Sequence, residues 1–257
     1  MVTPQLQELP PAFTQTPIAG KRGTRGFDTS HPGTPEAVWR SALAQAPAWT
    51  PPPGDLLIVS PHPDDETLAA GGLMRTWCRL GFKVTVLLLT DGEAACRHWP
   101  NLGEHRAKEL KEALDHLAGG KIRLVRLRIP DGRLGRARRR VRAALEDLRS
   151  EIGTLICPYE ADGHPDHEAA GQISLEFARA AGLGVVRYPI WFWHRSPSAA
   201  LEGLDPHRFW LDHATEEVKA QAIVCFGSQL SGRGEQAPVV PAHVVRYFRR
   251  PYEIFFL

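Results

Sequence analysis

From Asp55 onward, short apolar runs alternate along the chain with longer segments whose apolar residues recur every three to four positions. The short runs predict β-strands and the longer segments predict helices. Strands and helices that alternate at this spacing favour right-handed crossovers and a mostly parallel sheet. We therefore predict an α/β fold with helices on both faces of the sheet. The expected strands are 56–60, 83–90, 122–129, 154–158 and 184–189, and the expected helices are 67–80, 104–117, 135–152 and 167–181.

The segment before residue 54 differs from the rest of the chain. It holds 10 of the 22 prolines and one weak helical pattern, at residues 36–45. Because proline-rich chain rarely folds alone, we expect residues 1–53 to form an arm that packs across one domain of residues 54–257. Beyond Trp191 the pattern becomes irregular. The elements expected there are a helix at 215–226, a glycine-rich loop at 227–236, and terminal strands at 244–248 and 252–256.

The composition excludes several classes of protein. A net charge of +2 gives no general case for binding nucleic acid or a membrane surface. The four cysteines are widely spaced and lack any C-x-x-C pair, which disfavours a disulfide framework or a thiolate zinc site. No apolar run approaches the roughly 18 residues of a membrane span, and the N-terminus lacks a charged-then-apolar signal pattern. We expect a cytoplasmic protein without a nucleic-acid partner or stable membrane insertion.

Two clusters of histidines and carboxylates directly follow expected strands. The first is SPHPDDET at residues 60–67, and the second is GHPDHE at residues 163–168. Adjacent carboxylates repel one another and burial raises their pKa values, so such clusters favour a site where a cation neutralises them. Ligands of open parallel sheets bind beyond the carboxyl ends of the strands. The two clusters are therefore expected to face each other across one crevice.

The residue types in these clusters predict a metal-activated hydrolytic site. Catalytic zinc uses three nitrogen or oxygen ligands and leaves a fourth position for water. We expect His62, Asp65 and His167 to supply this set, with zinc as the metal and another divalent ion as the alternative. Pro63 suits the start of a helix that turns His62 and Asp65 to one side. Asp64 would stay free of the metal and take a proton from water, although a helix N-cap is an equally common use of an aspartate there.

Nucleotide-binding and nucleophile motifs do not compete with this interpretation. No G-x-G-x-x-G follows any expected strand, and Gly71 and Gly72 lie too far into the first helix to bind a phosphate. A P-loop and a G-x-S-x-G motif are also absent from the sequence. We interpret Glu66 and Asp166 as helix-terminal carboxylates or as partners of metal-bound histidines.

Together the two clusters resemble the paired motifs of the LmbE/PIG-L family of metal-dependent N-deacetylases, over roughly residues 55–229. The resemblance implies a Rossmann-like sheet and zinc held by His62, Asp65 and His167. It also implies Asp64 as general base and His164 as a second catalytic histidine, either an acid for the leaving amine or a cation that stabilises an oxyanion. The implied substrates are N-acetylglucosamine units, free or joined to a lipid, an inositol or an antibiotic. The expected function is removal of the N-acetyl group by zinc-activated water.

Outside the two clusters, several further positions are candidates for contact with a substrate. Arg106 and Asp131 resemble the arginine and aspartate that hold sugar hydroxyls in the family, and their alternatives are a solvated helix arginine and a β-turn aspartate. Where some family members have a tyrosine two residues before His164, this chain has Asp162. The aromatic segment 188–194 could form a wall for a sugar ring, although core packing is the commoner use of such a run.

Two other functions stay open at this point. One is a non-catalytic carbohydrate-binding protein that uses the same crevice, and the other is a metal-dependent amide or ester hydrolase with a non-sugar substrate. A free carboxylate at Asp64 favours catalysis, because binding alone needs no base beside a metal. The basic run 133–142 could meet an anionic lipid or phosphate, although the acidic Glu146 and Asp147 that follow favour a solvated helix face.

Overall fold

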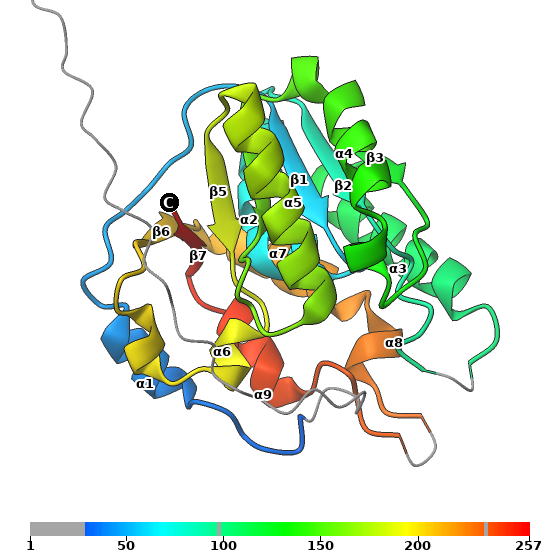
Figure 1. Cartoon of the computed structure of the whole chain (residues 1–257). Helices are drawn as coiled ribbons and strands as arrows, with labels where there is room; N and C mark the ends of the chain where they lie inside the picture. Colours follow the sequence, from blue (N-terminus) through cyan, green and yellow to red (C-terminus); the bar gives the residue numbers. More distant parts are fainter. Residues whose placement is uncertain (1–28, 97–98, 234–235) are drawn as a thin grey trace, which may run out of the picture.

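One seven-stranded sheet forms the centre of the molecule in a computed structural model that describes residues 29–96, 99–233 and 236–257 (Figure 1). The strand order is β3-β2-β1-β4-β5-β7-β6. The first five strands are parallel, and β7 runs antiparallel to both β5 and β6. The predicted mostly parallel α/β fold is confirmed. The strands are β1 (Leu56–Ser60), β2 (Val84–Leu88), β3 (Ile122–Arg126), β4 (Thr154–Pro158), β5 (Val185–Tyr188), β6 (Pro206–Trp210) and β7 (Tyr252–Phe256).

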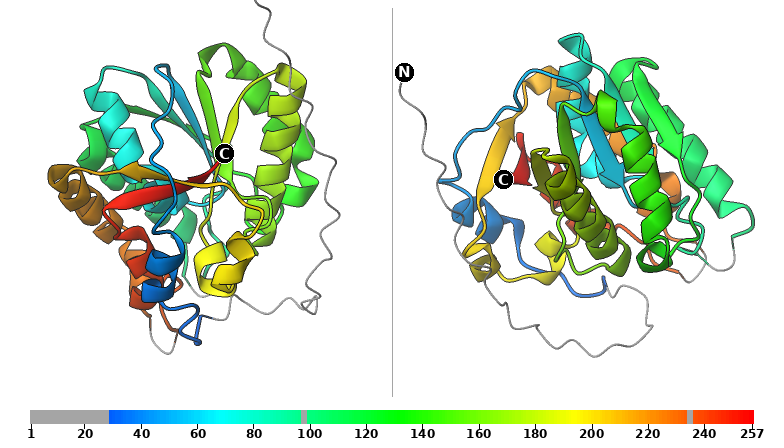
Figure 2. Two further views of the ribbon diagram at one scale, coloured as in Figure 1. Left: turned by 90° about the vertical axis from the view of Figure 1, so that its left-hand side faces the viewer. Right: turned by 45° about the horizontal axis from the view of Figure 1, so that its top comes forward.

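Helices cover both faces of this sheet, as the edge-on view in Figure 2 shows. Alternate residues of β1 face opposite sides, so Leu56 and Ile58 join the core beneath α2, α3 and α7, whereas Leu57 and Val59 join the core beneath α4 and α5. No helix in the described ranges has both the length and the apolar character needed to cross a bilayer. The helices are α1 (Glu36–Ala42), α2 (Asp65–Arg79), α3 (Leu102–Ala118), α4 (Arg138–Asp147), α5 (Pro165–Ala181), α6 (Phe192–Arg195), α7 (His213–Val224), α8 (Gly227–Leu230) and α9 (Ala242–Val245), with single 3-10 turns at η1 (Leu134–Arg136), η2 (Arg149–Glu151), η3 (Ser198–Leu201) and η4 (Arg246–Phe248).

The order of the strands places a crevice between β1 and β4. From β1 the chain builds outward through β2 and β3, and then returns to add β4 on the other side of β1. The loops after two such strands diverge to opposite faces of the sheet, which leaves a ligand-binding crevice at their carboxyl ends. The two histidine-carboxylate clusters follow these two strands, so the topology brings them together.

The C-terminal part differs from the sequence prediction. The strand expected at residues 244–248 is wrong, because the chain there forms α9 and η4. Val244, Tyr247 and Phe248 are buried, and their spacing is that of one face of a helix. Strand β6 was not predicted, since its five residues include a proline, a histidine and an arginine. The loop expected at 227–236 begins with α8, and residues 234–235 lie outside the described ranges.

The described part of the predicted arm packs against the C-terminal elements, whereas residues 1–28 lie outside the described ranges. Trp39 of α1 is fully buried, and its indole N–H donates to the carbonyl of Trp193 at 2.8 Å. The guanidinium of Arg250 donates to both carboxylate oxygens of Glu36, at 2.8 and 2.7 Å. These contacts fit an arm laid across a domain, and the domain boundary itself stays a prediction.

A buried carboxylate from the last strand caps an internal break in α2. Ala70 has non-helical angles, φ −134° and ψ 16°, so a second helical segment begins just after it. Glu253 of β7 accepts hydrogen bonds from the amides of Gly72 and Leu73, at 2.7 and 2.9 Å. The ammonium of Lys219 lies 2.7 Å from the same carboxylate and neutralises it. The first segment of α2 is thereby held as a separate turn, and this turn carries the first cluster.

Replacing Glu253 by glutamine should lower the free energy of unfolding by about 3 kcal/mol, because Lys219 would keep a buried charge without a counter-charge. Urea unfolding of the two proteins measures the difference. The double variant Lys219→Met/Glu253→Gln should recover part of the loss, since it removes the buried charge. A change below about 0.5 kcal/mol in the single variant would contradict this role for the pair.

Candidate metal centre

The turn after β1 is held by hydrogen bonds of its own side chains. Ser60 Oγ lies 2.8 Å from Glu66 Oε2, and the hydroxyl of Thr67 donates to Glu66 Oε1 at 2.6 Å. Glu66 is fully buried, and burial raises its pKa. Asp64 has a φ of 142°, in a region that residues other than glycine rarely adopt. Such strain persists only where the surroundings impose it, and here it turns Asp64 and Asp65 in different directions.

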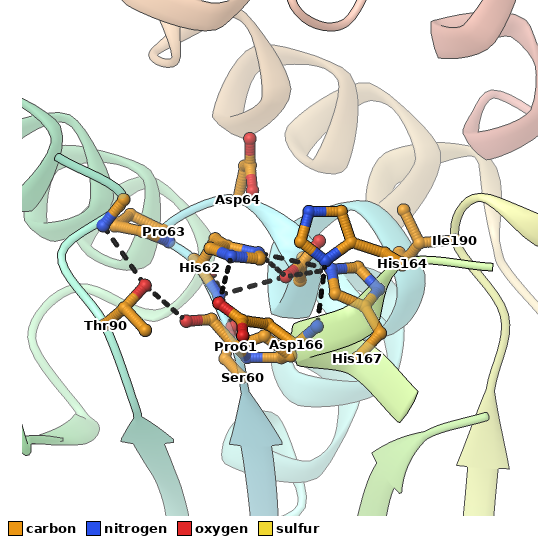
Figure 3. A network of polar contacts seen from close by, with 12 residues as sticks. Ser60, Pro61, His62, Pro63, Asp64, Thr90, His164, Asp166, His167 and Ile190 are labelled. Carbon is orange, nitrogen blue, oxygen red and sulfur yellow. Dashed lines mark hydrogen bonds and ion pairs between the residues drawn. The ribbon is translucent and has the colours of Figure 1, made fainter. Parts of the chain in front are cut away.

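Three potential ligand atoms from the two clusters converge on one point (Figure 3). His62 Nδ1 lies 3.2 Å from Asp65 Oδ2 and 3.2 Å from His167 Nε2, and His167 Nε2 lies 3.1 Å from Asp65 Oδ2. Ligands about 2.0–2.1 Å from a tetrahedral zinc ion are about 3.3 Å apart. All three side chains are buried. The residues predicted as ligands are therefore close together, and their donor types and spacing fit a divalent metal ion.

Carboxylates face the remaining nitrogens of the two imidazoles. His167 Nδ1 lies 2.8 Å from Asp162 Oδ2, and His62 Nε2 lies 3.2 Å from Asp131 Oδ1 and 3.6 Å from Asp166 Oδ2. Such partners hold each ring with its other nitrogen turned to a metal. Burial lowers the pKa of His167, but the carboxylates of Asp65 and Asp162 outweigh it and raise this pKa to about 9. Burial also lowers the pKa of His62, yet its carboxylate partners raise it well above the ordinary value.

Asp162 is the residue of this site that sequence reasoning missed. Its side chain is fully buried and accepts hydrogen bonds from the backbone amides of Ile190, Trp191 and Phe192, at 2.7, 3.0 and 3.1 Å. The sequence showed it only as the replacement for a tyrosine. In the structure it joins His167 to the chain between β5 and α6, so the backbone there fixes the orientation of this imidazole.

Asp64, next to Asp65 in the sequence, does not belong to the set of three potential ligand atoms. In Figure 3 its side chain lies on the same side of His62 as His164. Arg106 Nη2 donates to Asp64 Oδ2 at 3.2 Å, and burial raises the pKa of Asp64 to about 7 although Arg106 acts in the opposite direction. Asp64 occupies the N-cap position of α2, but among the described residues its carboxylate accepts no hydrogen bond from an amide at the start of that helix. Asp65 instead accepts from the His62 amide, at 3.0 Å.

His164 caps the N-terminus of α5 and packs against both other imidazoles. Its ring centroid lies 4.9 Å from that of His62 and 4.7 Å from that of His167. The amide of Asp166 donates to His164 Nδ1 at 3.2 Å, so the neutral ring carries its proton on Nε2. Burial, together with the neighbouring histidines, lowers the pKa of His164 well below its ordinary value. These contacts favour a neutral N–H donor over the cation considered from the sequence.

The two positions predicted to bind sugar hydroxyls contact the protein itself. Arg106 donates to the carbonyls of Gly92 and Pro63, both at 2.9 Å, and to Asp64. Asp131 faces His62 and accepts from the amide of Ala94 at 3.1 Å. Contact with a substrate stays a prediction for both residues. The observed contacts join Arg106 to Asp64 and Asp131 to His62.

The aromatic segment after β5 belongs to the core. Trp193 is 2% exposed and packs edge-to-face on Trp39, with ring centroids 5.0 Å apart. Trp191 and Phe192 are also buried. Core packing is thus the observed use of these rings.

Asp91, three residues after β2, forms a two-point ion pair with Arg126. Its Oδ1 lies 3.1 Å from Arg126 Nε and its Oδ2 lies 2.9 Å from Arg126 Nη2.

Comparisons with known proteins agree with this geometry. A family model described as GlcNAc-PI de-N-acetylase (PIG-L) matches residues 57–178. A 1D-myo-inositol 2-acetamido-2-deoxy-alpha-D-glucopyranoside deacetylase of Nocardia farcinica is 31% identical over 175 residues, which cover 54% of this chain and 57% of that protein. A diacetylchitobiose deacetylase of Thermococcus kodakarensis is 30% identical over 162 residues, covering 59% of this chain and 56% of that protein.

Solved structures show the same fold. The crystal structure of a conserved protein from Thermus thermophilus superposes with a TM-score of 0.56 at 30% identity, covering 70% of this chain and 81% of that one. By contrast, the chain spans less than two thirds of the length of the curated relatives, 57% and 56% for the two named above. The stretch that the family model matches, residues 57–178, includes both histidine-carboxylate clusters.

Proposed function

This chain belongs to the PIG-L family, and from that premise we propose that it is a metal-dependent hydrolase that removes the N-acetyl group of an N-acetylglucosamine-type sugar or glycoconjugate. One observation carries the proposal. His62, Asp65 and His167 converge within 3.2 Å of one another, and Asp64 lies beside them outside the set. The relatives named above, which are deacetylases of N-acetylated sugars, support the substrate class.

We propose zinc as the metal, with another divalent ion as the alternative. Two imidazole nitrogens and one carboxylate oxygen form a ligand set of a catalytic zinc site. A divalent ion held there supplies a Lewis acid, which polarises the acetamide carbonyl and lowers the pKa of a water molecule. The proposed ligands are His62 Nδ1, Asp65 Oδ2 and His167 Nε2.

The remaining residues supply proton transfer and charge stabilisation. Asp64 takes a proton from the attacking water and returns it to the leaving amine. Arg106 holds the Asp64 carboxylate in place during both steps. The Nε2–H of His164 donates a hydrogen bond to the carbonyl oxygen as negative charge develops on it. Acetate and the free amine are the products.

The first alternative, a carbohydrate-binding protein without catalysis, leaves Asp64 unexplained. A buried carboxylate in a strained backbone costs stability, and binding alone does not require it. The second alternative, an amide or ester hydrolase with a non-sugar substrate, would use the same catalytic residues. Only the substrate separates it from the favoured function. The cytoplasmic location expected from the sequence stays a prediction.

Acetate release tests the proposed function. Metal-stripped protein is reloaded with zinc and incubated with N-acetylglucosamine, its inositol conjugate, diacetylchitobiose and a simple activated acetamide. We expect acetate from at least one sugar substrate, and we expect a chelator to stop its release. Acetate from the acetamide alone would favour the non-sugar hydrolase, and no acetate from any substrate with the metal in place would favour the binding protein.

Replacing Asp162 by asparagine should weaken zinc binding by about 10- to 100-fold, the usual effect of losing a carboxylate behind a metal-bound histidine. Asparagine keeps an oxygen at the Oδ1 position for the amides of Ile190 and Phe192. It replaces the charged Oδ2, which faces His167 and accepts from the Trp191 amide, by an amide nitrogen. Competition with a chromogenic chelator measures the affinity. Glu168→Gln is the matched control, because Glu168 accepts a hydrogen bond from the Gly163 amide, at 3.1 Å, and from no imidazole among the described residues. Equal affinities for Asp162→Asn and the control would refute the orienting role.

Replacing Arg106 by alanine should lower turnover of a sugar and of a simple acetamide to the same degree. If Arg106 positions Asp64, its loss misplaces the base, which costs about 10²-fold whatever the substrate carries. Steady-state kinetics on both substrates give the comparison. A loss confined to the sugar would instead support the prediction that Arg106 binds hydroxyl groups.

A further inference from the structure

A second group of potential metal ligands lies on α3 and at the end of α7, two helices that pack against α2 and against each other. It consists of Glu112 and His116 of α3 and Cys225, which ends α7. Their ligand atoms all lie within 4.8 Å of one another. Glu112 and His116 are four residues apart, so they project from the same face of α3. Because α3 packs against α7, the end of α7 brings Cys225 to this face.

We propose that Glu112, His116 and Cys225 bind a second zinc ion, or a divalent ion of similar softness, at a site separate from the His62 centre. Zinc accepts carboxylate, imidazole and thiolate ligands together, and water can complete the tetrahedron. From the usual zinc–ligand distances of about 2.0–2.3 Å, the donors of such a site are about 3.3–3.8 Å apart. The ligand atoms now lie within 4.8 Å of one another, and small side-chain rotations would bring them to the spacing that zinc requires.

The surroundings of the three residues leave room for a cation. Glu112 and His116 form no ion pair with any described residue. Their neighbours Lys111 and Asp115 do pair with each other, with Lys111 Nζ 2.6 Å from Asp115 Oδ2. A hollow of about 430 Å³ is lined by Lys108, Lys111, Glu112, Asp115 and His116, so solvent reaches Glu112 and His116. Within the described ranges, the one hydrogen bond of the Cys225 thiol is a long contact, 3.6 Å, to the carbonyl of Gln221.

Spacing along the sequence did not predict this site. The cysteines form no C-x-x-C pair, and a thiolate zinc site was therefore not expected. The proposed site departs from that expectation, because its thiol follows one helix and its two companions come from another. Glu112 and His116 lie about 9 and 15 Å along α3 from Arg106. A metal ion at this distance would join two helices and stabilise the fold, and the basal activity would not depend on it.

Cobalt(II) titration of metal-stripped protein tests the proposal. The His62 centre contains no sulfur, so thiolate-to-cobalt charge-transfer absorption reports on Cys225 alone. We expect two cobalt ions per chain and this absorption band, and we expect added zinc to remove the band. Cys225→Ser and His116→Ala should each lose one ion and the band while keeping acetate release. Cys96→Ser is the matched control, since Cys96 is also a free, partly exposed cysteine, and it should keep both ions.

A single cobalt ion in the wild-type protein without the band would overturn the proposal, as would a band that survives in Cys225→Ser. Asp65→Ala separates the two sites, because it should lose the His62 ion and keep the band. Failure of the second site therefore leaves the proposed deacetylase function untouched. Thermal melts of each variant, recorded without metal, establish that lost binding does not reflect unfolding.

Discussion

Replacing Asp65 by alanine should abolish tight binding of the catalytic metal ion and, with it, acetate release. Asp65 Oδ2 is the only carboxylate oxygen among the three proposed ligand atoms, and it lies within 3.2 Å of both ligand nitrogens. Two neutral imidazoles alone hold zinc weakly, since a catalytic site uses three protein ligands. Metal content after dialysis against a chelator measures binding, and a coupled acetate assay measures activity.

Asp147→Ala is a matched control for Asp65→Ala, because Asp147 is an exposed aspartate at the end of α4. The control should keep both the metal ion and the activity. His62→Ala and His167→Ala should behave as Asp65→Ala does, because each removes one corner of the same triangle. Wild-type metal content in all three ligand variants would rule out this set of ligands and would move the metal to another group.

The proposed ligands were accessible to sequence reasoning because their position follows from topology. His62 and Asp65 follow β1, His167 follows β4, and these strands are neighbours at the point where the strand order reverses. Buried parallel strands read as apolar runs, so both strand ends could be located from the sequence. Residues that follow two such ends must meet at one edge of the sheet, whatever the number of residues between them.

Asp166 was expected as a possible partner of a metal-bound histidine and faces His62, but the partner roles of Asp162 and Asp131 were not accessible in this way. Asp162 is held by backbone amides of residues 190–192, and Asp131 meets His62 through the loop after β3. No sequence pattern encodes a hydrogen bond to a distant main-chain amide. Glu253 illustrates the same limit, because it caps the break in α2 from the last strand of the chain.

The C-terminal elements were mispredicted for a related reason. Val244 and Val245 favour a strand by local propensity, yet the chain there turns as a helix that buries Val244, Tyr247 and Phe248. Strand β6 has few apolar residues, because it pairs on one side with β7 and meets only the arm, at Ala48, on the other. Tertiary contacts therefore decide both cases against the local pattern.

Replacing Asp64 by asparagine should keep the metal ion and lower the rate of acetate release by about two to four orders of magnitude. This is the range expected when a positioned acid-base group is removed. The substitution leaves the fold in place, because asparagine tolerates a positive φ as aspartate does, and its side-chain oxygen can still accept the hydrogen bond from Arg106. The change therefore isolates proton transfer from metal binding and from packing.

Three measurements on one preparation of Asp64→Asn give the answer: metal content, melting temperature and acetate release. Unchanged metal and melting temperature with a rate lowered at least about 10²-fold would establish Asp64 as the base. The matched comparison is Asp65→Ala, in which activity and metal should be lost together. If Asp64→Asn retained activity within a factor of a few, the proton would have to pass through another group. Because the His164 ring packs against both His62 and His167, the same assay on His164→Ala would then test whether this histidine is the base.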